Sequence, residues 1–136
     1  MEQIRRWTDS PLRSLRILVV DDSAVNRSLV DAYLRASPHE LEFAENGRVA
    51  VDKFAIGDFD VVLMDIQMPV MDGHSATRAI RKLERSLGKP RTAIIVVSAS
   101  TSETEGERSL TAGCDLYLTK PLHKAKLLEV LHEHSH

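Results

Sequence analysis

The chain has 136 residues, of which 43% are hydrophobic and 28% are charged, as is typical of one soluble domain with its own core. Its net charge of -2 provides no basic surface for direct binding of nucleic acid or an anionic membrane, and its single cysteine, Cys114, excludes disulfides within the chain and cysteine-rich zinc sites. No apolar run approaches the roughly 18 residues of a membrane span. Residues 1–14 also lack the apolar core of a signal peptide, so we expect a cytoplasmic protein.

Residues 1–14 show no periodicity, and we expect them to form an arm or linker that contains Trp7. From residue 15 onward, short apolar runs bounded by turn residues alternate with apolar residues at helical spacing. The runs predict five strands, at residues 17–20, 41–44, 61–65, 93–98 and 116–119. A helix is expected after each strand, so that the domain spans residues 15–132 and residues 133–136 form a tail.

The helical spacing also predicts which helix faces are buried. The first helix is expected to bury Val25 and Leu29, and the third to bury Ile80 and to expose a basic face. That basic face consists of Arg78, Arg81, Lys82 and Arg85. The helix at residues 103–112 offers little apolar surface beyond Leu110, which fits either a mobile output surface or an ordinary exposed helix.

The six histidines could indicate a metal site or a phosphohistidine, but surface or solvated positions are expected for four of them. His74 opens the third helix and is predicted to lie on the surface. Three histidines alternate near the C-terminus, at positions 132, 134 and 136, and are expected to belong to a fraying tail.

Five strands alternating with five helices predict a parallel sheet covered by helices on both faces and joined by right-handed crossovers. The first and third strands are short and strongly apolar, so we place them at the centre of the sheet. The predicted fold is therefore an α/β, (βα)5 flavodoxin-like three-layer sandwich with the strand order 2-1-3-4-5.

Polar residues stand where four of these strands end. The first strand is followed by Asp21 and Asp22, the third ends at Asp65, the fourth at Ser98, and Lys120 follows the fifth. In a parallel sheet these ends meet at one edge, where open α/β sheets bind their ligands. Asp65 alone could equally be a helix cap or a turn residue. The coincidence at four strand ends favours a functional site.

The predicted cluster has a clear electrostatic consequence. Carboxylates about 4 Å apart repel each other by roughly 4 kcal/mol per pair at an effective dielectric constant near 20, so a proton or a cation must relieve the repulsion. Oxygen ligands without cysteine or paired histidine favour Mg²⁺, with Mn²⁺ as an alternative. Near such a metal, an aspartate can attack phosphorus and become an acyl phosphate. Lys120 and the Ser98 hydroxyl would then pair with the phosphoryl oxygens.

Four short motifs carry a resemblance to a known family. From about Leu15 to about Leu131, the chain resembles the receiver (response-regulator, CheY-like) domains of two-component signalling. The motifs are Val19-Val20-Asp21-Asp22, Met64-Asp65-Ile66-Gln67-Met68-Pro69-Val70-Met71-Asp72-Gly73, Val97-Ser98-Ala99 and Leu118-Thr119-Lys120-Pro121. The second motif is most similar to receivers of hybrid histidine kinases or phosphorelays.

The resemblance implies a role for each matching residue. Asp65 would be the phosphorylated aspartate, and Mg²⁺ would be held by Asp22 directly and by Asp21 through water. Lys120 would be the lysine that is characteristic of receiver domains, followed by a cis peptide bond to Pro121. The remaining roles are a further metal ligand from the Gln67 backbone carbonyl, a switch formed by Ser98 and Tyr117, and tuning of the phosphoryl lifetime by Gln67 and Ser100. Ser98 replaces the commoner threonine but keeps the hydroxyl.

The implied function is to accept a phosphoryl group from a phosphohistidine on a histidine kinase or a histidine phosphotransfer protein. The signal would leave through the face formed by the fourth helix, the fifth strand and the fifth helix. Such a domain has phosphotransfer and autodephosphorylation chemistry but is not an enzyme in its own right. It would belong to a histidine kinase only if it had been excised from a hybrid kinase.

Three alternatives are weighed against this function. A haloacid-dehalogenase-type phosphatase also uses an aspartate and Mg²⁺, but it requires a second acidic residue two positions after the first, and this chain has Gln67 there. A flavin mononucleotide carrier shares the fold, but Asp21 and Asp22 would repel the flavin phosphate. A degenerate receiver that acts only as a scaffold would not need all the matching positions intact.

Overall fold

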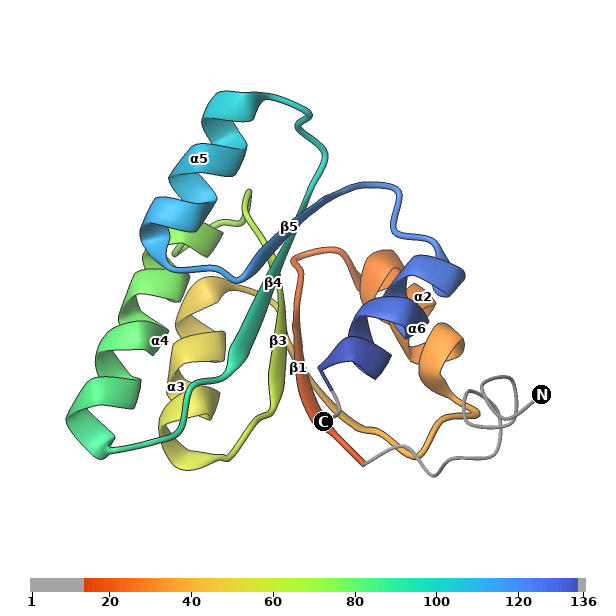
Figure 1. Cartoon of the computed structure of the whole chain (residues 1–136), viewed down its shortest axis with the longest axis horizontal. Helices are drawn as coiled ribbons and strands as arrows, with labels where there is room; N and C mark the ends of the chain where they lie inside the picture. The colour runs from red at the N-terminus through yellow and green to blue at the C-terminus, as the bar shows by residue number, and fades with distance from the viewer. Residues whose placement is uncertain (1–13, 135–136) are drawn as a thin grey trace.

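The computed structural model describes residues 14–134. A five-stranded parallel sheet with the order β2-β1-β3-β4-β5 forms the middle layer (Figure 1). Helices α2 and α6 cover one face, and α3, α4 and α5 cover the other. The predicted fold class and strand order are confirmed. The bounds are β1 (Arg16–Val20), α2 (Ala24–Leu34), β2 (Glu40–Ala44), α3 (Gly47–Ile56), β3 (Val61–Asp65), α4 (Gly73–Leu87), β4 (Ala93–Ser98), α5 (Glu103–Ala112), β5 (Leu116–Thr119) and α6 (Lys124–Glu133).

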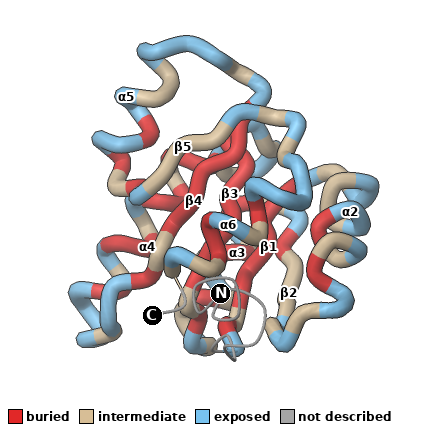
Figure 2. The backbone as a smooth tube through the Cα atoms, turned by 45° about the vertical axis from the view of Figure 1, so that its right-hand side comes forward, coloured by how far each residue is buried: buried red, intermediate tan, exposed pale blue. Residues whose placement is uncertain are grey.

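The central strands are buried on both faces because successive side chains point to opposite sides of a sheet. In β1, Leu18 and Val20 pack with α3 and α4, whereas Ile17 and Val19 pack with α2 and α6. β3 and β4 alternate in the same way. Figure 2 shows β1, β3 and β4 as a continuous buried centre. This two-sided burial explains the unbroken apolar runs of the sequence.

Short polar residues begin four of the helices. The side chains of Ser23, Asn46, Asp72 and Ser102 each accept a hydrogen bond from a backbone N–H in the first turn of the helix that follows. Such a cap stabilises a helix by about 1 kcal/mol. Among these residues is Asp72, from the loop after Asp65, so this loop ends at a well-anchored helix.

The prediction about the buried face of the first helix is wrong. Val25 is 76% exposed and Leu29 is 43% exposed, and α2 instead buries Val30 and Leu34. In α5, Leu110 is exposed while its neighbour Ser109 is buried. In α2, several faces were compatible with the spacing of apolar residues. The packing partner, which the spacing does not reveal, selected the face that is buried.

Two charged or titratable residues of α4 were also placed wrongly. His74 and Arg81, which were both expected on the surface, are only 5% and 6% exposed. α4 is pressed against α5 and against the start of β4, so its contact surface is wider than its apolar stripe. Long polar side chains occupy the edges of this surface because they find hydrogen-bond partners there.

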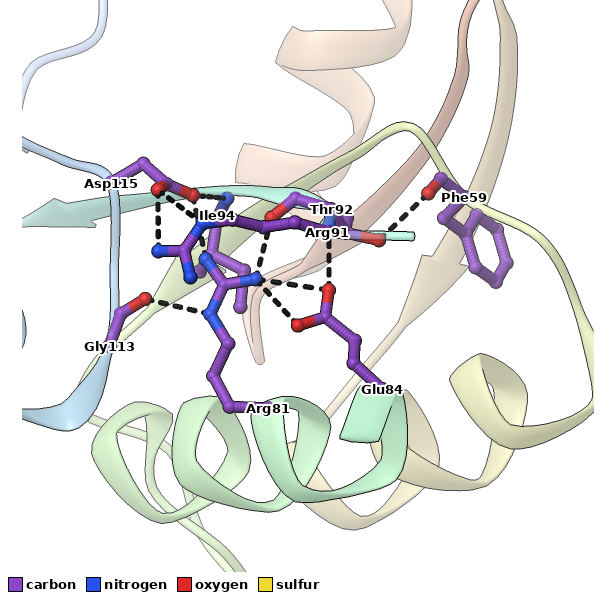
Figure 3. A network of polar contacts seen from close by, with 8 residues as sticks. All are labelled: Phe59, Arg81, Glu84, Arg91, Thr92, Ile94, Gly113 and Asp115. Atoms are coloured by element: carbon purple, nitrogen blue, oxygen red, sulfur yellow. Dashed lines mark hydrogen bonds and ion pairs between the residues drawn. The ribbon is translucent and has the colours of Figure 1, made fainter. Parts of the chain in front are cut away.

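Arg81 is the centre of a buried polar network (Figure 3). Its Nη1 donates to the Glu84 carboxylate at 2.9 Å and to the Thr92 carbonyl at 2.7 Å. Its Nη2 donates to Asp115 at 2.7 Å, and its Nε donates to the Gly113 carbonyl at 2.8 Å. The network therefore fastens α4 to the start of β4 and to the turn between α5 and β5.

The predicted tail is partly helical, because α6 continues to Glu133 and His134 caps it. His134 lies on the helix end through a contact of its Nδ1 with the Val130 carbonyl at 2.8 Å. The predictions about the Trp7 arm and His136 lie outside the described residues. None of the helices in residues 14–134 has both the length and the apolar character that a membrane crossing needs.

Candidate functional site

The carboxyl ends of the strands meet at one edge of the sheet, as predicted. Strand β1 is followed by Asp21, β3 ends at Asp65 and β4 ends at Ser98. The register pairs Asp65 with Val97 and Ser98 with Thr119, so the residues at the strand ends are level with one another. The fold therefore assembles the site from segments far apart in the sequence.

Three carboxylates gather at this edge. Asp21, Asp22 and Asp65 each offer one oxygen, and these oxygens lie within 4.8 Å of one another. Asp21 and Asp65 are buried and Asp22 is exposed. The Lys120 ammonium stands beside the cluster, with Nζ 3.3 Å from Asp21 Oδ2 and 3.5 Å from Asp65 Oδ1. One ammonium thus serves two buried carboxylates.

The electrostatics leave Asp65 short of positive charge. Burial raises the pKa of the Asp65 carboxyl above its usual value, and the neighbouring charge of Asp21 raises this pKa further. Lys120 and the Ile66 N–H oppose the rise without cancelling it. A buried carboxylate with a raised pKa favours a bound cation or proton. Since all the side-chain donors are oxygens, the cluster fits a hard divalent ion such as Mg²⁺.

Asp21 is held in place by the first turns of α2. Its Oδ1 accepts from the Ser23 N–H at 2.9 Å, and its Oδ2 lies 3.3 Å from Asn26 Nδ2. Arg27 Nη1 donates to the Asp21 carbonyl at 2.6 Å. Asn26 and Arg27 were not among the predicted site residues. Their position one helical turn after the paired aspartates is the signal that could have revealed them.

Ser98 and Tyr117 are joined through Ser100. The buried Ser98 hydroxyl accepts a hydrogen bond from the Ser100 N–H at 3.1 Å. The Tyr117 hydroxyl donates to the Ser100 carbonyl at 2.6 Å. The Lys120–Pro121 peptide bond is cis, as expected. Ser98 and Tyr117, which were predicted to act as a switch, are therefore linked by one hydrogen-bonded chain through Ser100.

The loop between β3 and α4 closes tightly behind Asp65. The Gly73 N–H donates to the Ile66 carbonyl at 2.8 Å. A Cβ atom on Gly73 would lie 2.1 Å from the Asp65 carbonyl oxygen, so only glycine fits there. Gln67 is exposed at the start of this loop, and its carbonyl stays a predicted ligand. Val70 is 80% exposed and adopts a φ of 72°, which is strained for a β-branched residue.

A cavity of about 360 Å³ adjoins the acidic cluster and extends below α2. Its polar side is formed by Asp21, Asn26, Asp65 and Lys120. The rest of its wall is mainly apolar, and includes Leu29, Val30, Tyr33, Leu63, Val97, Pro121 and Leu122. The cluster is thus reached from a partly apolar cleft rather than from a flat surface.

The response regulator receiver domain model matches residues 17–132. The chain belongs to this family. The receiver is the phosphoacceptor domain of two-component signalling, so the resemblance inferred from the four motifs is confirmed. The family match gives no support to a haloacid-dehalogenase-type phosphatase.

The chain is 37% identical over 142 residues to the oxidative stress response two-component system protein SSK1 of Candida albicans. This match covers 85% of the chain but 21% of SSK1, so the chain spans about a fifth of that relative. The receiver of the sensor histidine kinase PA1611 of Pseudomonas aeruginosa, solved with magnesium in its active-site cleft, has a TM-score of 0.79 and 35% identity, covering 88% of this chain and 96% of that one.

A second solved structure is the Ssk1 receiver of Saccharomyces cerevisiae in complex with the histidine phosphotransfer protein Ypd1. Its TM-score is 0.85 at 29% identity, and the match covers 91% of this chain and 90% of that one. The chain is therefore similar both to a receiver of a kinase and to a receiver downstream of a phosphotransfer protein.

Proposed function

We propose that Asp65 is the residue that accepts the phosphoryl group. The observation that carries this proposal is the position of its buried carboxylate, at the end of β3, within the acidic cluster and 3.5 Å from Lys120 Nζ. In the transfer, the phosphorus–nitrogen bond of a phosphohistidine breaks as an Asp65 oxygen bonds to phosphorus. The imidazole leaves with the electron pair and takes up a proton.

Asp21, Asp22 and Asp65 are the residues that would hold Mg²⁺, with the Gln67 carbonyl as a further ligand. Mn²⁺ suits the same oxygen donors. A bound divalent ion supplies charge neutralisation between the carboxylates and the incoming phosphoryl oxygens. Asn26 and the Ser23 N–H keep Asp21 turned toward the cluster without adding charge.

Lys120 and Ser98 would stabilise the phosphorylated form. Phosphorylation adds about -1.5 to -2 charge, which the Lys120 ammonium can pair with directly. If the Ser98 side chain rotates to bring its hydroxyl to a phosphoryl oxygen, its hydrogen bond from the Ser100 N–H lengthens or breaks. Because Ser100 also holds Tyr117, this rotation can shift the equilibrium between two conformations. The face of α5, β5 and α6 would present the change to a downstream target.

The phosphoryl donor would be a histidine kinase or a histidine phosphotransfer protein. The Ssk1 receiver in complex with Ypd1 supports the second class of donor. In this chain, Val25 and Val70 are exposed apolar residues that follow Asp22 and Asp65 closely in sequence, and Leu29 lines the cleft. These residues would supply apolar contacts for a donor beside the negatively charged site.

The domain would act as a signalling module rather than as an enzyme in its own right, with its own acyl-phosphate hydrolysis setting the lifetime of the signal. Gln67, near the start of the loop after Asp65, and Ser100, whose N–H contacts Ser98, would tune this lifetime.

The proposal is tested by measuring acyl phosphate formed from acetyl phosphate or from a phosphorylated phosphotransfer protein. Wild-type protein with Mg²⁺ should be labelled, whereas Asp65→Asn and wild-type protein in excess EDTA should not. Asp72→Asn is the matched control, because asparagine can keep the helix cap of Asp72 while a nearby carboxylate is removed. Labelling of Asp65→Asn at the wild-type level would show that another residue accepts the phosphoryl group.

A further inference from the structure

Helix α5 is held to the domain by few apolar contacts. Its buried residues are Ser109 and Ala112, and none of its residues belongs to either hydrophobic core cluster of the described chain. It packs beside α4 at the outside of the helix layer (Figure 1). The position of α5 therefore depends strongly on its polar contacts.

His74 makes the polar contact between α4 and the middle of α5. Its Nε2 lies 2.9 Å from the Oγ of the fully buried Ser109 and 3.4 Å from the Glu105 carboxylate. His74 directly follows Gly73, whose N–H closes the loop behind Asp65. The imidazole thus connects the phosphoacceptor loop to α5.

A second connection reaches the same helix from Ser98. The Ser98 hydroxyl holds the Ser100 N–H, and the Ser100 carbonyl holds the Tyr117 hydroxyl. The ring of Tyr117 faces Gly106 of α5. Through these contacts, a rotation of Ser98 toward Asp65 would be coupled to the position of α5.

We propose that His74 is a positioning residue for phosphoryl acceptance that acts through α5. Its contact with Ser109 holds α5 in the position that this structure shows and so opposes a rotation of Ser98 toward Asp65 that would displace α5. The proposal rests on the proposed function of Asp65. If only a fraction of molecules has Ser98 free to turn, the apparent affinity for a phosphoryl group is reduced by that fraction. Loosening the contact should raise this fraction.

The first measurement is the affinity for beryllium fluoride, a phosphoryl mimic, in the presence of Mg²⁺. His74→Leu and Ser109→Ala each remove the contact and keep a side chain that tolerates burial. Each should bind beryllium fluoride about threefold to tenfold more tightly than wild type. The double variant should gain no more than either single variant, because all three lose the same contact. His74→Gln, which keeps a donor in reach of Ser109, should stay near wild type.

A second measurement reports on α5 itself. The chain has two tyrosines, so fluorotyrosine gives two ¹⁹F resonances that Tyr33→Phe assigns. In His74→Leu without beryllium fluoride, the Tyr117 resonance should already be shifted toward its position in the beryllium fluoride complex.

Thr77→Val is the matched control, because Thr77 is a buried residue of α4 whose hydroxyl has no hydrogen-bond partner among residues 14–134. It should leave the affinity and the Tyr117 resonance unchanged. Unchanged affinity in His74→Leu and Ser109→Ala, or an equal gain in Thr77→Val, would overturn the role of His74. Either result would leave the proposed role of Asp65 intact, because labelling of Asp65 in the wild-type protein does not depend on His74. Failure of wild-type protein to bind beryllium fluoride would instead count against the proposed function.

Discussion

Replacement of Arg81 by methionine should destabilise the protein strongly. The guanidinium is buried and donates to two carboxylates and two backbone carbonyls. Methionine fills similar space but donates nothing. Glu84, itself buried, would keep only its bond from the Thr92 N–H at 2.6 Å. Leaving one partner of a buried ion pair uncompensated costs about 3–5 kcal/mol. Asp115 loses less, because Arg91 and the Ile94 N–H still donate to it.

The free energy of unfolding, measured in urea by circular dichroism, tests this expectation. Lys82→Met is the control, because Lys82 lies on the exposed face of the same helix. It should change the free energy of unfolding by less than about 0.5 kcal/mol. Arg81→Met combined with Glu84→Met should recover part of the loss, since both buried charges are then gone. An Arg81→Met variant within 1 kcal/mol of Lys82→Met would refute the view that this network stabilises the fold.

Three further predictions follow from the geometry. Gly73→Ala should cost more than about 2 kcal/mol in unfolding free energy and lower Asp65 phosphorylation, because the new Cβ would collide with the Asp65 carbonyl. Asp65→Asn should raise the melting temperature of the metal-free protein, because burial and Asp21 raise the pKa of Asp65 and make its charged form unfavourable. This rise in melting temperature should become smaller when Mg²⁺ is added. Burial lowers the pKa of His39 below 6.5, and its Nδ1 accepts from the Leu15 N–H. Its contribution to stability should be complete above pH 6.5 and decline as the pH falls below it, which urea titrations of wild type and His39→Asn at pH 5 and pH 7.5 can detect.

Much of the fold was predictable because its signals are local. The strands β1, β3 and β4 are buried on both faces. Their apolar runs therefore indicate a buried strand whichever helices cover them. Gly88 and Gly113 end α4 and α5 with positive φ angles, which is where glycine commonly ends a helix. The burial of individual helix residues was less predictable. Arg81 is a charged residue whose burial depends on its partners, three of which lie 11 or more residues away along the chain.

The candidate site was likewise predictable in part. The sequence by itself determined the types of residue at the strand ends, and thereby the aspartates, the serine and the lysine of the cluster. Only the tertiary structure decided that one ammonium is shared by Asp21 and Asp65, and that His74 faces Ser109. The physical reason is that strand ends are aligned by the backbone ladder of a parallel sheet, whereas side-chain partners are selected by how the helices pack on it.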